Sequence, residues 1–121
     1  MNVLGLFEQS EYIEEFSDGE TIFREDTPGD VMYVVLEGKV EIRVRGRSIY
    51  TAAAGEVVGE MALIDSKARS ASAVALGQCR LAPVDQQEFL STVQQVPSFA
   101  LHIMRVLADR VRYMDEQAKG K

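Results

Sequence analysis

The hydrophobic period of the chain points first to a β-rich centre. Residues 39–45 alternate strictly between apolar and polar side chains, as a half-buried strand does. Short runs of this kind recur between residues 20 and 84, separated by turn residues. We expect seven or eight short strands there, with chain turns at Gly38 and Gly77. Such close and regular spacing predicts an antiparallel barrel or jelly roll.

Helical patterns flank this region on both sides. Residues 3–16 place apolar side chains among acids in a loosely helical pattern, which predicts a short amphipathic helix. Residues 85–118 have a period near 3.6, and Asp85 with Glu88 forms a capping-box-like start. The protein is therefore expected to be mainly β with flanking helices. The first C-terminal helix should turn three residues inward: Phe89, Leu90 and Val93.

The long C-terminal helix, expected from Ser98 to Gln117, carries apolar residues on more than one face. A helix that packs against one β-roll needs only one apolar stripe. A second stripe implies a second surface to bury. We expect this surface to form a parallel homodimer through Leu101, Met104, Ala108 and Val111.

Composition bounds the size and the partners of the protein. The chain has 121 residues, of which 46% are hydrophobic and 26% charged, as expected for a single domain over residues 1–121. Its net charge of −6 divides into −8 over residues 1–30 and +2 over the remainder. This balance argues against nucleic-acid binding, which needs many clustered cations. A small anion held at one site remains compatible with it.

Cysteine and histidine content limits the chemistry further. The single cysteine, Cys79, cannot form an internal disulfide, which favours a reducing cytoplasm, and we expect it to be a buried strand residue. The single histidine, His102, excludes a metal site of several histidines and is interpreted as a helix-surface residue. The chain lacks a long apolar run, so we expect no membrane span. Because the sequence offers no cluster of metal ligands, we also expect no metal, and no cofactor beyond a bound ligand.

A segment suited to phosphate begins at Gly59. Glycine lets a ligand approach the backbone, and a short helix opening at Glu60 would present unpaired N–H groups from Glu60, Met61 and Ala62. Arg69 adds a permanent planar charge, and the hydroxyl of Ser70 can donate a further bond. A carboxylate beside a phosphate suggests a second task for Glu60, that of accepting hydrogen bonds from ribose hydroxyls. Each residue also has a purely structural explanation, but their combination points to a nucleotide.

At these residues the sequence resembles the cyclic-nucleotide-binding domain family. Its phosphate-binding cassette reads Gly-Glu-x-Ala-Leu, five residues, then Arg-x-Ala, as from Gly59 to Ala71 here. The segment from Phe23 to Ile42 also looks like the hairpin region of the family. The resemblance covers residues 7–115 and implies the antiparallel β-roll of that family over residues 20–84.

The resemblance also implies roles for individual residues. Glu60 would accept from the ribose 2′-hydroxyl, and Arg69 would pair with the cyclic phosphate. The remaining expected contacts are Ser70, Ala71, Gly59 and the backbone N–H groups of Met61 and Ala62 around the phosphate, with Val57 and Val58 lining the sugar and base. The base would be capped by a residue between 110 and 115, with Tyr113 or Arg112 as candidates. Packing for Tyr113 and solvent exposure for Arg112 are the alternatives, and the charges at 109–110 and 115–116 are read as a solvated face.

The expected function is that of a non-enzymatic sensor. The ligand, cAMP by preference and otherwise cGMP, would order the cassette and move the C-terminal helix. The output would then pass to an unidentified partner or to the dimer. Two alternatives remain open: a scaffold domain of the same fold that binds no nucleotide, and the sensor part of a transcription regulator without its DNA-binding domain.

Overall fold

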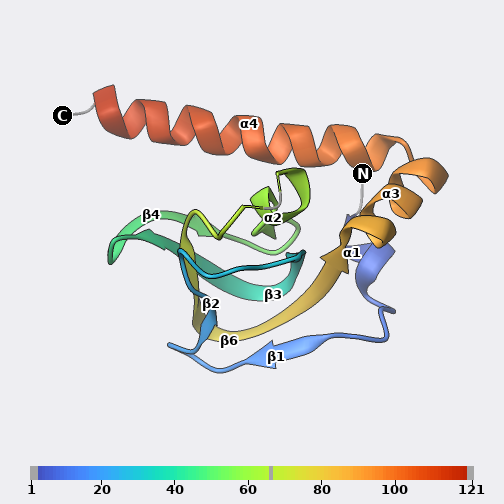
Figure 1. Ribbon diagram of the computed structural model, residues 1–121, viewed down its shortest axis with the longest axis horizontal. Helices are drawn as coiled ribbons and strands as arrows, with labels where there is room; N and C mark the ends of the chain where they lie inside the picture. The colour runs from blue at the N-terminus through green and yellow to red at the C-terminus, as the bar shows by residue number, and fades with distance from the viewer. Residues whose placement is uncertain (1–2, 66, 120–121) are drawn as a thin grey trace.

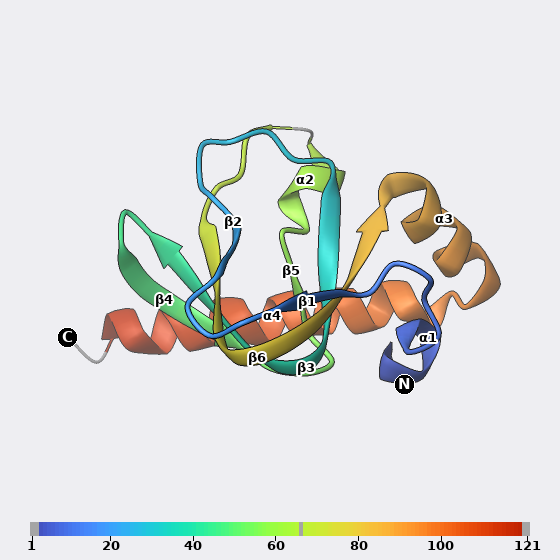
Figure 2. The same ribbon diagram turned by 90° about the horizontal axis from the view of Figure 1, so that it is seen from below.

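Two long strands frame the fold in the computed structural model, which describes residues 3–65 and 67–119. β3 (Val31–Val44) and β6 (Ser72–Asp85) pair antiparallel along most of their length. Four shorter strands extend this pair: β1 (Glu14–Phe16), β2 (Thr21–Phe23), β4 (Arg47–Ala52) and β5 (Val57–Val58). The sheet order is β1-β6-β3-β4, with β2 on β6 and β5 on β3, and the strands curl around one another in Figure 2. The predicted antiparallel β-roll with flanking helices is confirmed, with six strands over the described residues.

The two glycines that were expected to turn the chain lie inside long strands. Gly38 and Gly77 have the expected positive φ, +89° and +78°. However, the β3 and β6 ladder continues on both sides of them, with register shifts between Val35 and Lys39. The hairpin predicted at Gly38 was therefore wrong: glycine bends a continuous strand at a corner of the roll, as a bulge does. This explains why fewer and longer strands form than the pattern predicted.

The N-terminal segment is only partly helical. α1 (Val3–Phe7) buries Val3 and Phe7, but the helix predicted over residues 3–16 ends there. β1 instead pairs antiparallel with Cys79 to Leu81 of β6. The loosely helical spacing was overridden because these residues complete an edge of the sheet, where their backbone groups find hydrogen-bond partners.

The C-terminal helices follow the predicted order. α3 (Gln86–Gln95) begins where Asp85 accepts a 2.8 Å hydrogen bond from the Glu88 N–H, as the capping pattern predicted. Leu90 is an exception, since it is 60% exposed rather than turned inward. α4 (Ser98–Lys119) then crosses the roll beside the short helix α2 (Met61–Ile64), as Figure 1 shows. Among the described helices, none is both long and apolar enough to span a membrane.

The core has two parts, one on each face of the sheet. The first joins the sheet to the helices, where the Phe99 ring lies 5.6 Å from Phe7 and 5.5 Å from Phe89 between ring centres. The second fills the inside of the roll and includes the buried thiol of Cys79, as predicted. Successive residues of β5 point to opposite parts, Val57 to the first and Val58 to the second. β5 is thus fixed from both sides immediately before the cassette begins.

Candidate functional site

The turn at Gly59 leads from the fixed strand β5 into the short helix α2. Gly59 has a φ of +76°, which favours glycine, and Glu60 follows as the N-cap residue of the helix. The N–H of Ala62 donates to the carbonyl of Gly59 at 3.2 Å. Ala62 was expected to offer a free N–H group, and this expectation was wrong because the first turn of the helix already uses it.

Arg69 is the centre of the cassette. Its side chain is buried, at 6% exposure, and its Nη1 donates to the carbonyl of Gly59 at 3.1 Å. The guanidinium carbon lies 4.2 Å from the centre of the Phe23 ring. The backbone is fixed as well, since the Arg69 N–H donates to Thr27 and its carbonyl accepts from Asp26, both at 2.8 Å. The chain thus holds this cation firmly in a buried place.

The charge of Arg69 is nevertheless not matched by the protein. Among the described residues it forms no ion pair, and its Nε is buried without a hydrogen-bond partner. Burial lowers the pKa of the guanidinium from its ordinary value, while the acidic groups of Tyr33, Asp30 and Glu60 act in the opposite direction. A buried cation with an unused donor is costly unless an anion completes the site.

Two glycines leave room for this guanidinium. A Cβ on Gly29 would lie 2.2 Å from Nε of Arg69, and one on Gly59 would lie 2.6 Å from Nη1. Any side chain at either position would therefore displace the guanidinium. Gly29 comes from the loop before β3, 40 positions away from Arg69 in the sequence, and it was not among the predicted site residues.

A cavity of about 340 Å³ opens beside Arg69. Its walls include six of the predicted site residues: Gly59, Glu60, Met61, Ala62, Ser70 and Ala71. Arg69 itself also lines it, together with Phe23 and residues of β3, β4 and α4. Val57 and Val58 do not, because both are fully buried in the two core parts. The expectation that their side chains line the sugar and base was wrong for this reason.

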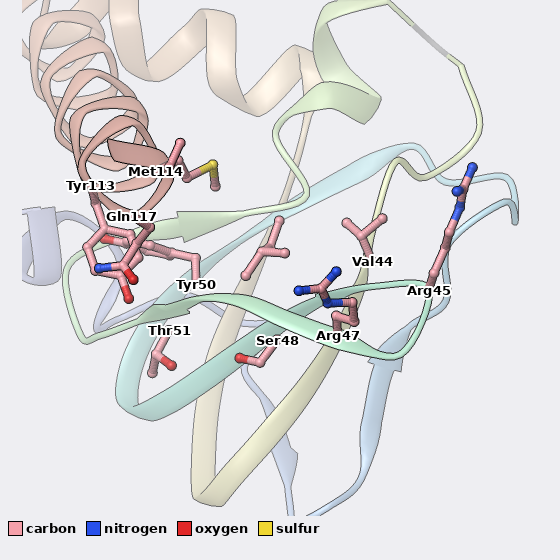
Figure 3. Close-up of a pocket in the computed structure, with 11 residues that line it drawn as sticks. Val44, Arg45, Arg47, Ser48, Tyr50, Thr51, Tyr113, Met114 and Gln117 are labelled. Atoms are coloured by element: carbon pink, nitrogen blue, oxygen red, sulfur yellow. The ribbon is translucent and has the colours of Figure 1, made fainter. Parts of the chain in front are cut away.

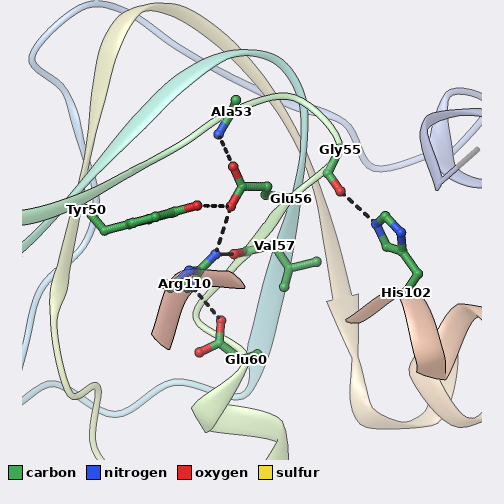
Figure 4. Close-up of polar contacts among 8 residues, drawn as sticks. All are labelled: Tyr50, Ala53, Gly55, Glu56, Val57, Glu60, His102 and Arg110. Atoms are coloured by element: carbon green, nitrogen blue, oxygen red, sulfur yellow. Dashed lines mark hydrogen bonds and ion pairs between the residues drawn. The ribbon is translucent and has the colours of Figure 1, made fainter. Parts of the chain in front are cut away.

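The sequence reasoning missed Arg110, the second buried charge of the site. It was read as part of a solvated face, but it is 7% exposed and lines the cavity from α4. Its Nη2 donates to the Val57 carbonyl at 2.6 Å, and its Nη1 lies 3.3 Å from Oε1 of Glu60 (Figure 4). Glu56 lies 3.5 Å from Nη2, and the guanidinium stacks over Tyr50. Like Arg69, Arg110 has a buried Nε without a partner among the described residues.

A signal for Arg110 was present in the helical spacing. Phe99 and Ile103 are buried on α4, Leu107 packs against the same core, and Arg110 continues that stripe one turn later. A charged residue on the buried face of a helix needs a polar partner. Spacing along the helix could therefore have separated Arg110 from its solvated neighbours.

Of the range 110–115 that was expected to cap the base, Arg110 and Met114 line this cavity, whereas the two named candidates, Tyr113 and Arg112, do not. Tyr113 is 44% exposed and packs edge-on against Tyr50, with 5.4 Å between ring centres. It lines an adjoining groove of about 730 Å³ between β4 and the end of α4, in which Figure 3 places Tyr113 near Tyr50 and Gln117. Arg112 is exposed and bonds to Asp109 at 3.2 Å. The alternatives of packing for Tyr113 and exposure for Arg112 describe this arrangement.

The only histidine is a contact of α4 rather than a free surface residue. Nε2 of His102 lies 3.0 Å from the carbonyl of Gly55, to which it donates (Figure 4). With Arg110, it ties α4 to the backbone segment that leads into the cassette. Within residues 3–65 and 67–119, no group of three or more acidic, histidine or cysteine side chains is placed to hold a metal.

Comparison with known proteins gives a family match over most of the chain. The family model described as "Cyclic nucleotide-binding domain" matches residues 13–96. The chain is 32% identical over 103 residues to a CRP-like cAMP-activated global transcriptional regulator of Mycobacterium tuberculosis, covering 81% of this chain and 46% of that protein. It is 32% identical over 105 residues to a cyclic AMP receptor protein of Thermus thermophilus, covering 83% and 49%.

The fold is also shared with solved structures. The crystal structure of the Thermus thermophilus catabolite activator protein matches with a TM-score of 0.73 and 30% identity, over 89% of this chain and 53% of that one. The chain therefore spans about half the length of the curated relatives that it matches.

Proposed function

The chain belongs to the cyclic nucleotide-binding domain family, and from this we propose that it binds cAMP, or else cGMP, in the cavity beside Arg69. The observation that carries the proposal is the buried Arg69, which has an unused Nε donor and no carboxylate partner among the described residues. A cyclic phosphate carries one negative charge and supplies the acceptor oxygens that this donor lacks. The cAMP named in the descriptions of both relatives supports the choice of base.

The ligand would lie across the cavity from Arg69 to α4. The cyclic phosphate would contact Arg69, with the Ser70 hydroxyl and the N–H of Met61 beside it. The ribose hydroxyl would donate to Glu60, whose side chain is 14% exposed. The base would then point toward Arg110, whose buried Nε can donate to a ring nitrogen or carbonyl. The volume of 340 Å³ lies within the range of about 300–1,000 Å³ typical of small-molecule sites.

Binding would act through α4 rather than through chemistry on the ligand. Glu60 belongs to the cassette and Arg110 to α4, so a ligand that engages Glu60 also changes a contact of the helix. A ligand shifts a conformational equilibrium only if it binds one state better, and a hydroxyl bound to Glu60 would alter this ion pair. We expect a regulatory sensor without catalytic activity.

The exposed face of α4 supports a further proposal about assembly. Of the four residues expected to form a dimer face, Leu101, Met104 and Val111 are 58%, 62% and 57% exposed, and Ala108 is partly buried. We expect this face to pair with a second copy of the chain. A DNA-binding region outside this sequence is the alternative output, since the chain spans only about half of its transcription-regulator relatives.

Isothermal titration calorimetry of the protein with cAMP, cGMP and 5′-AMP tests the binding proposal. We expect saturable heat with cAMP or cGMP and binding at least tenfold weaker for 5′-AMP, whose phosphate carries an additional negative charge against a single arginine. Arg69→Met should abolish the heat. Arg80→Met is the matched control, because Arg80 forms a surface ion pair with Glu37 instead. Absence of heat with both cyclic nucleotides would contradict the proposal and support the scaffold alternative.

A further inference from the structure

Glu60 has a partner on α4, and a ribose hydroxyl that uses the same carboxylate oxygen must share or replace it. Nη1 of Arg110 lies 3.3 Å from Oε1 of Glu60. A ribose hydroxyl that donates to this same oxygen would compete with a buried guanidinium. Simply losing this ion pair would leave Arg110, which is only 7% exposed, with less charge compensation, and this is unfavourable for a buried cation.

A second carboxylate stands on the other side of the same guanidinium. Oε1 of Glu56 lies 3.5 Å from Nη2 of Arg110. Charge-assisted N–H···O bonds are typically about 2.7–2.9 Å long, so both carboxylates lie beyond the usual length of such a bond. Arg110 is shared between the two, while its short 2.6 Å bond to the Val57 carbonyl provides a fixed point (Figure 4).

Glu56 is itself held in place as an acceptor. Its Oε1 accepts from the Tyr50 hydroxyl at 2.7 Å, and its Oε2 accepts from the Ala53 N–H at 3.0 Å. The Tyr50 ring lies under the guanidinium, 4.8 Å from its carbon atom. Glu56 and Tyr50 thus provide a carboxylate and an aromatic ring that are already positioned to contact Arg110, independently of Glu60.

We infer that Glu56, oriented by Tyr50, is a specificity-determining residue for ribose: it takes over Arg110 when a ribose hydroxyl occupies Glu60. This inference rests on the proposed binding of a cyclic nucleotide. Without Glu56, Arg110 stays on Glu60, and the hydroxyl gains little. Preference for the ribose over the 2′-deoxyribose form of the ligand therefore depends on a residue that need not touch the ligand.

The test measures the ratio of dissociation constants for cAMP and 2′-deoxy-cAMP, or for the corresponding cGMP pair if the protein binds cGMP. Effects of a substitution on the phosphate site act on both ligands and cancel in this ratio. We expect the wild-type protein to bind the ribose form at least tenfold more tightly, as one hydrogen bond to a charged group provides. In Glu56→Gln the preference should fall to threefold or less.

Two further variants make the result specific. Tyr50→Phe keeps the ring under Arg110 but removes the hydroxyl, and we expect it to lower the preference to between the other two values. Glu41→Gln is the matched control: Glu41 is also a largely buried carboxylate paired with an arginine, Arg43, but it does not line the cavity. It should keep the wild-type ratio.

Three outcomes would overturn the inference. An unchanged ratio in both Glu56→Gln and Tyr50→Phe would show that Glu56 does not take over Arg110. A wild-type protein without ribose preference would show that Glu60 is not the hydroxyl acceptor. A wild-type protein that binds no cyclic nucleotide would instead refute the proposed function, and this inference with it. Circular dichroism of each variant establishes that it is folded before its ratio is compared.

Discussion

Arg69 and Arg110 are both buried, but the protein compensates their charges differently. Arg110 has two carboxylates and a carbonyl around it. Arg69 has one carbonyl and an aromatic ring, and no ion pair within the described part of the chain. A buried charge that lacks an ion-pair partner disfavours folding, and a bound anion would explain why it is there. At the residue scale, we therefore propose Arg69 as the charge that binds the ligand and Arg110 as its link to α4.

Gly29 allows this assignment to be tested without altering a charge. In Gly29→Ala the new methyl group would overlap Nε of Arg69, so the guanidinium must move. Because only the end of a side chain has to shift, we expect the free energy of unfolding to change by less than about 1 kcal/mol. Ligand affinity should fall at least tenfold by calorimetry.

Gly46→Ala is a suitable comparison for this variant. Gly46 lies in the turn after β3 with open space around it, and its positive φ of +79° makes the alanine mildly strained. It should lose some stability and keep the wild-type affinity. Wild-type affinity in Gly29→Ala would show that the position of the Arg69 guanidinium does not matter for binding.

At the scale of elements, α4 meets the cassette segment at two backbone carbonyls. His102 contacts Gly55, and Arg110 contacts Val57, two turns further along the helix. We expect cAMP to change amide hydrogen exchange of α4 most strongly around Arg110, because this is the end whose ion pair with Glu60 changes. Exchange mass spectrometry with and without saturating nucleotide measures the effect. Equal protection in both states would contradict a role of α4 in signalling.

The elements were predictable where local pattern decides them. The cap at Asp85 and the extent of α4 follow from spacing and turn residues. The strand pattern predicts an antiparallel barrel or jelly roll, and the family resemblance implies the β-roll. The N-terminal strand β1 was not predictable, because its pairing with β6 involves residues more than 60 positions away. The positive φ of Gly38 and Gly77 was predicted correctly, but the chain turn expected at each was not formed. A bend within a strand and a turn between strands can both use a glycine with positive φ, so the sequence does not distinguish them.

The residues of the candidate site also differ in whether local sequence or tertiary packing reveals them. Gly59, Glu60 and Arg69 fall within one short segment, so their combination was visible in the sequence. Gly29 and Arg110 reach the site from the loop before β3 and from α4, and only tertiary packing shows them. The sequence therefore predicts the residues of the cavity that lie between Gly59 and Ala71, but not Gly29 or the contribution of Arg110 from α4.

The whole molecule has a net charge of −6, and α4 exposes Leu101, Met104 and Val111 along one face. We expect sedimentation velocity to show a dimer at tens of micromolar protein, because Leu101, Met104 and Val111 would otherwise stay exposed to water. Met104→Glu should shift the protein to monomer without loss of folding. Leu76→Glu, a substitution of an exposed apolar residue on β6, should not. A wild-type monomer at several hundred micromolar would contradict this assembly.

The central claim is that a buried, unpaired Arg69 holds a cyclic nucleotide. Urea unfolding of the wild-type protein and of Arg69→Met, each with and without nucleotide, tests it most directly. A ligand at 100 times its dissociation constant should raise the free energy of unfolding of the wild type by about 2.7 kcal/mol. Arg69→Met should show no such increase, while its stability without ligand stays within about 1 kcal/mol of the wild type. An equal increase in both proteins, or none in the wild type, would contradict the account.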